Sequence, residues 1–208
     1  MTQRLKFFRA PKAACLALAI ASTTLLGACA PLLVGGAMLG GAMSYTDRRT
    51  AGAQVEDAGI ELKAANRIAP LTGGHVNVTS FNRTVLLSGE VPSEAERLAV
   101  DKAVGEIEGV LATVNELIVG FSSSYSARGQ DSILTSKVKA SYIDAKDLQA
   151  NALNVITERG TVYLMGRVTE REAGRATDIA RGVAGVAKVV RLFEVISESE
   201  LAQLQPKK

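Results

Sequence analysis

The sequence predicts an α+β fold built from two tandem copies of one small α-β-β-α-β module. The strand VLLSGEV at 85–91 returns as VYLMGRV at 162–168, which lies 77 residues later. Each of these strands leads into a helix-opening sequence, PSEAE in the first copy and TEREA in the second. A glycine-valine pair, at Gly109 and again at Gly185, precedes a last apolar strand. We expect each copy to form a three-stranded sheet with two helices on one face.

The length of the chain suggests that the two copies support each other. Each copy takes about 65–70 of the 208 residues, a size at which a single hydrophobic core is marginal. We therefore expect the copies to pack together. The expected divisions are a signal peptide at 1–28, a lipidated cysteine and apolar glycine-rich tether at 29–54, modules at 55–120 and 131–197, a linker at 121–130 and a tail at 198–208.

Each copy opens with an amphipathic helix whose inward positions follow i, i+3, i+4 spacing. In the first copy this helix begins near Val55 and is stopped by the PLTGG sequence at 70–74. In the second copy it begins at Asp131 and covers 132–143, after a polar Ser/Gly linker. The expected inward positions are Asp57, Ile60, Ala64 and Ile68 in the first copy and Leu134, Val138 and Tyr142 in the second.

A β-hairpin, a second helix and a last strand follow in each copy. Polar residues at 82–83 and 159–160 predict the hairpin turns. The capping sequences S-x-x-E and T-x-x-E open the second helices, and a glycine ends each of them. The expected strands are 75–79, 84–91 and 112–119 in the first copy and 154–158, 161–168 and 188–196 in the second. The expected inward positions of the second helices are Ala95, Leu98, Ala99, Ala103 and Ile107, and Ala173, Ala176, Ala180 and Val183.

The N-terminus reads as a lipoprotein signal peptide. Basic residues up to Lys12 precede the apolar run AACLALAIASTTLLGA, and Leu26-Gly27-Ala28-Cys29 resembles the bacterial lipobox. That motif implies cleavage before Cys29, with a diacylglycerol and an N-acyl chain on this residue. Acyl chains anchor a protein at roughly 0.8 kcal/mol per buried CH₂. In such lipoproteins Ala30, where an Asp would retain the protein at the inner membrane, implies sorting to the outer membrane, with the chain facing the periplasm.

Two other fates of the N-terminus remain open. Cleavage after Ala21, at an A-x-A site, would release a soluble periplasmic protein with a free Cys29. The absence of charge between Lys12 and Asp47 also allows an uncleaved membrane helix, although Pro31 and several glycines disfavour it. The apolar segment after Cys29 either lies against the membrane or serves as a flexible tether.

The charge balance argues against nucleic acid as a partner. The net charge of the chain is +3, but four basic residues and no acid precede Cys29, so the mature chain carries about −1. The two copies differ, because residues 46–120 carry a net −4 and residues 131–198 a net +1. The second copy is therefore the better candidate for contact with an anionic surface.

The two copies resemble the BON domain. The resemblance is carried by a G-x-V after the central strand and a G-V before the last strand. These residues are Gly89 and Val91, Gly109 and Val110, Gly166 and Val168, and Gly185 and Val186. Two such modules behind a lipobox are similar to dual BON-domain outer-membrane lipoproteins. That resemblance implies a non-enzymatic protein that binds anionic phospholipid through the first helix of its second module and supports envelope integrity.

The corresponding helix of this chain is 132–143, and relatives can carry a Trp where this chain has Ile133. The residues expected to contact phospholipid are Ile133, Leu134, Lys137, Lys139, Ser141 and Tyr142. Ile133 beside Lys137 offers an apolar tip with a cation that can reach the interface. The alternatives are an ordinary amphipathic helix with a solvated face, and a lipid-anchored adaptor that contacts envelope proteins.

The sequence offers no enzyme motif. His75 is the only histidine and reads as an exposed loop residue, so we expect no metal site. The paired acids of PSEAE and TEREA open helices, where carboxylates favour the helix dipole. There is no Walker loop, dinucleotide fingerprint or GxSxG sequence. We therefore expect no catalysis, no cofactor beyond the lipid on Cys29 and no small-molecule substrate.

Overall fold

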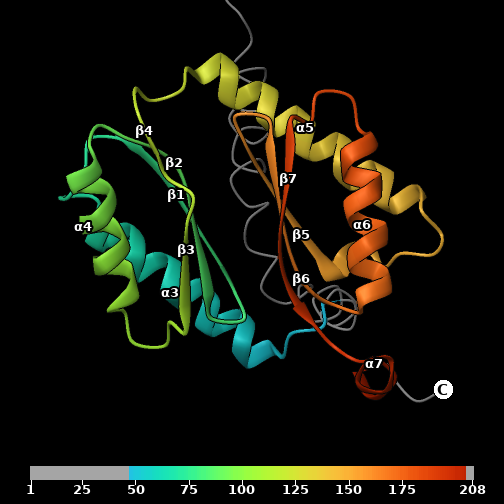
Figure 1. The fold of residues 1–208 in the computed structure, drawn as a ribbon. Helices are drawn as coiled ribbons and strands as arrows, with labels where there is room; N and C mark the ends of the chain where they lie inside the picture. The colour runs from blue at the N-terminus through green and yellow to red at the C-terminus, as the bar shows by residue number, and fades with distance from the viewer. Residues whose placement is uncertain (1–46, 205–208) are drawn as a thin grey trace, which may run out of the picture. The chain divides into compact units, whose positions relative to one another are not determined.

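The structure is a computed structural model that describes residues 47–204. The predicted signal peptide, Cys29 and most of the tether lie outside the described residues. The first module contains α3 (Ala51–Ile68), β1 (His75–Phe81), β2 (Thr84–Val91), α4 (Glu94–Gly105), β3 (Ala112–Asn115) and β4 (Ile118–Val119). The second contains α5 (Tyr125–Asp144), η2 (Ala150–Ala152), β5 (Leu153–Glu158), β6 (Thr161–Val168), α6 (Glu170–Gly182) and β7 (Lys188–Val195), and α7 (Glu198–Leu204) follows it. The predicted α-β-β-α-β order is confirmed in both modules (Figure 1).

Each module holds one mixed sheet with its second strand in the centre. In the first module β2 pairs antiparallel with β1 and parallel with β3 and β4. In the second module β6 pairs antiparallel with β5 and parallel with β7. The hairpin turns have positive φ at Asn82, Arg83, Arg159 and Gly160, as two-residue turns with the right twist require. The parallel pairings need a crossover, which α4 and α6 provide.

Helices α3 and α5 begin earlier than their apolar patterns suggest. Thr50 caps α3 by accepting a hydrogen bond from the Ala53 N–H, and Ser124 caps α5 by accepting one from the Ala127 N–H. Residues 125–130, expected to be linker, are therefore the first turns of α5. The polar composition of this segment concealed a serine N-cap, a residue type that initiates helices.

The last strand of the first module is interrupted, contrary to the prediction of one strand over 112–119. β3 ends at Asn115, whose side-chain Oδ1 accepts a hydrogen bond from the Leu117 N–H at 3.1 Å. Leu117 is buried in the core of this module. The interruption between β3 and β4 coincides with the inward position of Leu117, and the chain pairs with β2 again in β4.

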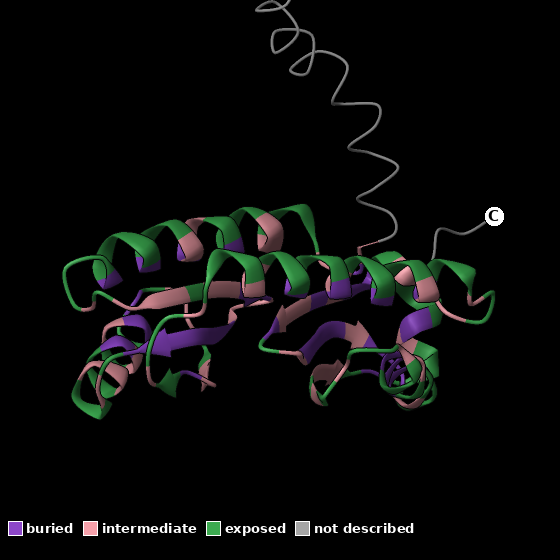
Figure 2. Cartoon of the chain, turned by 90° about the horizontal axis from the view of Figure 1, so that it is seen from above, coloured by how far each residue is buried: buried purple, intermediate pink, exposed green. Residues whose placement is uncertain are grey.

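Each module has a core between its helices and one face of its sheet. The inward positions expected for α3 and α5 are buried, and Ala173, Ala176 and Ala180 of α6 are buried as expected. Figure 2 shows the matching pattern, in which the helices turn exposed faces away from the strands.

The expected inward face of α4 is wrong in part. Val100 and Val104 are the buried residues of this helix, whereas Leu98 is 56% exposed and Ala95 and Ala99 are exposed. Apolar residues occupy both sides of α4, so its period alone did not decide which side packs on the sheet.

A third apolar cluster joins the outer faces of the two sheets. Phe81 and Leu86 of the first module pack with Tyr163 and Met165 of the second. The neighbouring residues of β2 and β6 point into the separate module cores, so both central strands are buried on both faces. This cluster confirms that the two modules pack together.

The four expected structural glycines all have positive φ. At Gly89 a Cβ would lie 2.0 Å from the His75 carbonyl oxygen, and at Gly166 it would lie 2.4 Å from the Ala152 carbonyl oxygen. These two glycines therefore let the hairpin strands approach each other closely. Gly109 and Gly185 have the positive φ expected of them, 99° and 105°. They do not end the second helices, however, because α4 ends at Gly105 and α6 ends at Gly182. The prediction that these two glycines end the helices is therefore wrong.

Candidate functional site

The candidate site is the outward face of α5. The inward row of this helix is buried, and its spacing of three and four residues turns the next row toward solvent. Ile133 is 59% exposed, and Lys137, one turn later, is also exposed. An apolar side chain and a cation therefore lie next to each other on the surface of the helix.

A pocket with a volume of about 480 Å³ lies beside this face of α5. Its lining combines apolar groups with two cationic side chains. It includes Ile133, Leu134, Lys137, Arg159, Gly160 and Gly185. The volume is within the range of small-ligand sites. The lining also includes the acid Asp131, so the two cations leave it with one net positive charge, which favours an anionic group.

The other residues predicted to contact lipid occupy different positions. Leu134 and Tyr142 are buried, and the Tyr142 hydroxyl donates a hydrogen bond to the Ala176 carbonyl at 3.0 Å. Burial raises the pKa of Tyr142. Ser141 is half-buried and donates to the Lys137 carbonyl. Lys139 is exposed, but two residues after Lys137 it projects from a different side of the helix. The structure thus brings together Ile133, Lys137 and the edge of Leu134.

Two exposed aromatic residues precede this face. Phe121 is 97% exposed, and Tyr125, the first residue of α5, is 89% exposed. The Arg128 guanidinium lies 5.4 Å from the centre of the Tyr125 ring. Sequence reasoning missed both residues because it treated 121–130 as a polar linker. The presence of two aromatic residues in a Ser/Gly segment could have indicated that the segment contributes to a contact surface.

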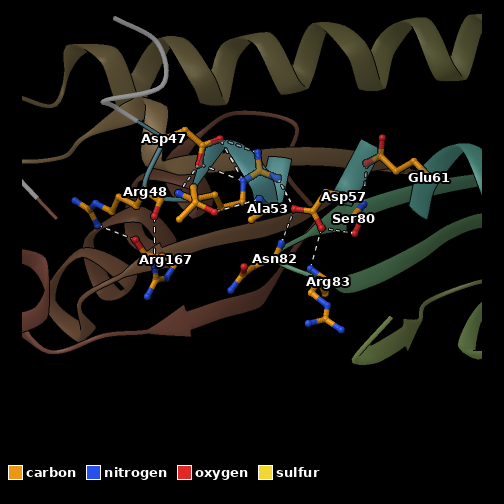
Figure 3. A network of polar contacts seen from close by, with 11 residues as sticks. Asp47, Arg48, Ala53, Asp57, Glu61, Ser80, Asn82, Arg83 and Arg167 are labelled. Carbon is orange, nitrogen blue, oxygen red and sulfur yellow. Dashed lines mark hydrogen bonds and ion pairs between the residues drawn. The ribbon is translucent and has the colours of Figure 1, made fainter. Parts of the chain in front are cut away.

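A buried aspartate joins the first helix of each module to its hairpin. In the first module the Asp57 carboxylate accepts hydrogen bonds from the Asn82 and Arg83 N–H groups, each at 2.8 Å (Figure 3). In the second, the Asp131 carboxylate accepts from the Arg159 and Gly160 N–H groups, each at 2.9 Å. In both modules the aspartate lies three residues before the first apolar residue of the inward row. This repeated position of an acid in the two copies could have indicated a shared structural role. Sequence reasoning assigned them only to the helices.

A buried ion pair connects the start of the described chain to the second module. The two guanidinium nitrogens of Arg48 lie 2.6 and 2.7 Å from the two carboxylate oxygens of Glu172, and both side chains are 5% exposed. Arg48 also donates to the Arg167 carbonyl at 2.8 Å, and Arg167 donates back to the Arg48 carbonyl at 3.2 Å (Figure 3). Glu172 also completes the predicted capping box with Thr169. The pairing of Arg48 with Glu172 has no signal in the sequence.

His75 opens β1 and is not an exposed loop residue, so that prediction is wrong. Its side chain is 19% exposed and lies between two buried carboxylates. His75 Nδ1 is 3.6 Å from Glu90 Oε2 and 3.9 Å from Glu158 Oε1. Burial raises the pKa of Glu158, although the Asn77 side-chain amide and His75 oppose this shift. The sequence search for metal ligands centred on the single histidine and missed these two glutamates, which come from different modules.

The buried carboxylates make stability sensitive to acid. Burial opposes the ionisation of Asp57 and Glu172, but hydrogen bonds from Ser80 and Arg83 to Asp57, and from Arg48 and Thr169 to Glu172, lower their pKa values. A lowered folded-state pKa contributes stability above the unfolded pKa of about 4, and this contribution is lost as the pH falls through the folded pKa.

We therefore expect the urea midpoint to fall as the pH drops below about 4.5. The Glu172→Gln variant should be less stable than the parent protein at about pH 7, and the difference should shrink toward pH 3. Urea unfolding followed by circular dichroism at several pH values measures both quantities. A constant difference across this range would contradict the assignment.

No helix of residues 47–204 is long and apolar enough to cross a membrane. Residues 56–120 and 130–197 both match the BON domain, and the chain belongs to this family. The expected family and fold class are thereby confirmed.

Similar proteins extend over most of the chain. The chain is 36% identical to the outer membrane lipoprotein DolP of Haemophilus influenzae over 187 residues, which cover 87% of this chain and 95% of that protein. It is 29% identical to the 21 kDa hemolysin of Actinobacillus pleuropneumoniae, covering 72% of this chain and 79% of that protein. It is 31% identical to the osmotically-inducible protein Y of Escherichia coli, covering 55% and 58%. Among solved structures, the C-terminal domain of CdsD from Chlamydia trachomatis aligns with 65% of this chain and 96% of its own, at 9% identity and a TM-score of 0.29.

Proposed function

We propose that this protein is a lipid-anchored, non-enzymatic protein of the outer membrane that faces the periplasm and binds anionic phospholipid through α5. In this function Cys29 carries the acyl anchor, and the second module recognises the membrane surface to support envelope integrity. The similarity to an outer membrane lipoprotein over nearly its whole length supports the location. The lipobox-like sequence before Cys29 supports the anchor.

The observation that carries lipid binding is the pairing of Ile133 with Lys137 on the exposed face of α5. An exposed isoleucine can enter the headgroup region while a neighbouring lysine contacts the phosphate. Arg159 lines the pocket beside them, and part of its charge compensates the Glu90 carboxylate 3.5 Å away. Each cation near an anionic surface contributes about 1 kcal/mol.

The first module provides an internal comparison. Its equivalent helix carries Lys63 in the position of Lys137, but Gly59 stands in the position of Ile133. That module also carries the net negative charge. The features proposed to bind lipid therefore occur together on α5 and not on α3.

The test is co-flotation of residues 46–208, which lack the acyl anchor, with phosphatidylcholine or phosphatidylglycerol vesicles at low and high salt. We expect binding to the anionic vesicles alone, weakened by salt as the Debye length falls below about 10 Å. Lys137→Glu should weaken binding about thirtyfold, since charge reversal changes the interaction by about 2 kcal/mol. Ile133→Asp should weaken it at least as strongly, because it removes an apolar contact and adds an anion.

The matched controls are Lys63→Glu and Leu62→Asp on α3, where both residues are exposed. These variants should bind as the parent protein does apart from the small effect of net charge. Circular dichroism checks that all four variants are folded. Equal binding by the parent protein and both α5 variants would refute the proposed surface.

A protein-interaction adaptor is the second candidate, and the exposure of Phe121 and Tyr125 favours it. Aromatic side chains are enriched at protein interfaces. In this case residues 46–208 would bind neither kind of vesicle, and Cys29 would be the sole membrane contact.

A further inference from the structure

Three side chains of types that can bind metals lie close together where the two modules meet. His75 is the first residue of β1, and Glu90 is its register partner in β2. Glu158 is the last residue of β5 in the second module. One nitrogen of His75 and one oxygen of each glutamate lie within 4.8 Å of one another.

The geometry of this cluster leaves two buried atoms without hydrogen bonds. His75 Nδ1 and Glu158 Oε1 are buried and have no hydrogen-bond partner, although they are only 3.9 Å apart. The Glu158 side chain is 5% exposed and that of Glu90 is fully buried. Buried polar atoms nearly always have a partner, and buried carboxylates need compensating positive charge. The two atoms without a partner point to a ligand between them.

Neighbouring donors hold both carboxylates in place. The Asn77 side-chain amide donates to Glu158 Oε2 at 2.8 Å. The Ser123 N–H and hydroxyl donate to Glu90 Oε2 at 3.1 and 3.2 Å. Outer donors of this kind orient metal-ligating carboxylates. The Arg159 guanidinium is 3.5 Å from Glu90 Oε1 and half-exposed, so it compensates only one of the two carboxylates.

We propose that His75, Glu90 and Glu158 bind a divalent first-row transition-metal ion, with zinc preferred, which links the two modules. In a tetrahedral zinc site with bonds of about 2.0–2.2 Å, two ligand atoms are about 3.3–3.6 Å apart. The distances of 3.6 and 3.9 Å from His75 Nδ1 need only small side-chain shifts to reach this range. An imidazole ligand selects zinc over magnesium and calcium, and zinc also accepts carboxylate oxygen. Water would complete the coordination.

The test uses the full chain in a non-ionic detergent after removal of metals with EDTA. Calorimetric titration with zinc chloride should show one strong site, and magnesium chloride should show none. Zinc at a hundred times its Kd should raise Tm by roughly 5–10 °C, because it binds only the folded arrangement. Far-UV circular dichroism follows the unfolding.

Two conservative variants and one control decide the assignment. Glu158→Gln and His75→Gln should each abolish the strong site and the rise in Tm, while Glu106→Gln, on an exposed carboxylate, should keep both. Glu158→Gln retains an oxygen for the Asn77 amide, so it tests the proposal even if His75→Gln fails to fold. A parent protein without a strong zinc site, or zinc binding unchanged by Glu158→Gln, would overturn the proposal.

Discussion

Replacing Asp57 by alanine is expected to lower the free energy of unfolding by about 3–5 kcal/mol. Its carboxylate accepts from two backbone N–H groups of the hairpin turn, and from the Ser80 hydroxyl at 2.7 Å. The Arg49 guanidinium also donates to it at 2.8 Å. Each buried donor left without an acceptor costs about 1–3 kcal/mol. Urea unfolding followed by circular dichroism measures the loss.

The neighbouring Glu56 is the matched control for Asp57. Its side chain is 44% exposed, and its contact with Arg83 is an ion pair at 3.3 Å. Glu56→Ala should cost less than about 1 kcal/mol, as exposed ion pairs do. Asp131→Ala in the second module should lower the free energy of unfolding by about 2–4 kcal/mol, because it leaves the Arg159 and Gly160 N–H groups without an acceptor. A loss at Asp57 no larger than that at Glu56 would disprove the role of the buried carboxylate.

Arg48→Met is expected to destabilise the protein by about 3–5 kcal/mol, the usual cost of removing one partner from a buried ion pair. Methionine retains much of the length of the side chain but leaves the buried Glu172 carboxylate without its cation. Glu172 would keep only the backbone hydrogen bond from Thr169. The same urea experiment gives the change in the free energy of unfolding.

A double variant separates loss of the charge pair from loss of packing. Adding Glu172→Gln to Arg48→Met removes the uncompensated carboxylate, so the double variant should be more stable than the sum of the two single losses predicts. Arg175→Met, which breaks an exposed contact with Asp147, should cost less than about 1 kcal/mol. Additive losses in the double variant, or an Arg48 loss as small as that of Arg175, would contradict the prediction.

The sequence predicted the elements that depend on local chemistry. The repeated central strands, the polar hairpin turns and the inward rows of α3 and α5 appear where their patterns place them. Of the two predicted capping boxes, the one at Thr169 is complete, whereas Ser93 forms only the N-cap hydrogen bond with the Glu96 N–H. Period and turn chemistry act over a few residues, so they can be read without knowing what packs against them.

The errors occurred where local patterns allow more than one outcome. Apolar residues on both sides of α4 left its inward face undecided, and Val100 and Val104 are the buried pair. The break between β3 and β4 follows from the burial of Leu117 and the hydrogen bond to Asn115. Both features depend on how the chain packs in the folded module, so the local sequence does not predict them.

The candidate lipid site was predictable in part. The residue spacing in α5 predicted that Ile133 and Lys137 are exposed, and the structure confirms this exposure. The contribution of Arg159 to the same pocket comes from the hairpin turn, and only the fold brings it there. Leu134 and Tyr142 belong to the inward row, and their burial follows from the same spacing.

The sequence by itself determined the two-module α+β architecture, the BON family and the exposed face of α5, because repeats, turn residues and helical period are local properties. Only the tertiary structure decided which buried charges meet. Arg48, which precedes the first module, reaches Glu172 of the second module. His75 lies near both Glu90 and Glu158 because the two modules pack together. The pairing of buried charges depends on atoms far apart in the chain, and no local pattern specifies which of them will be neighbours.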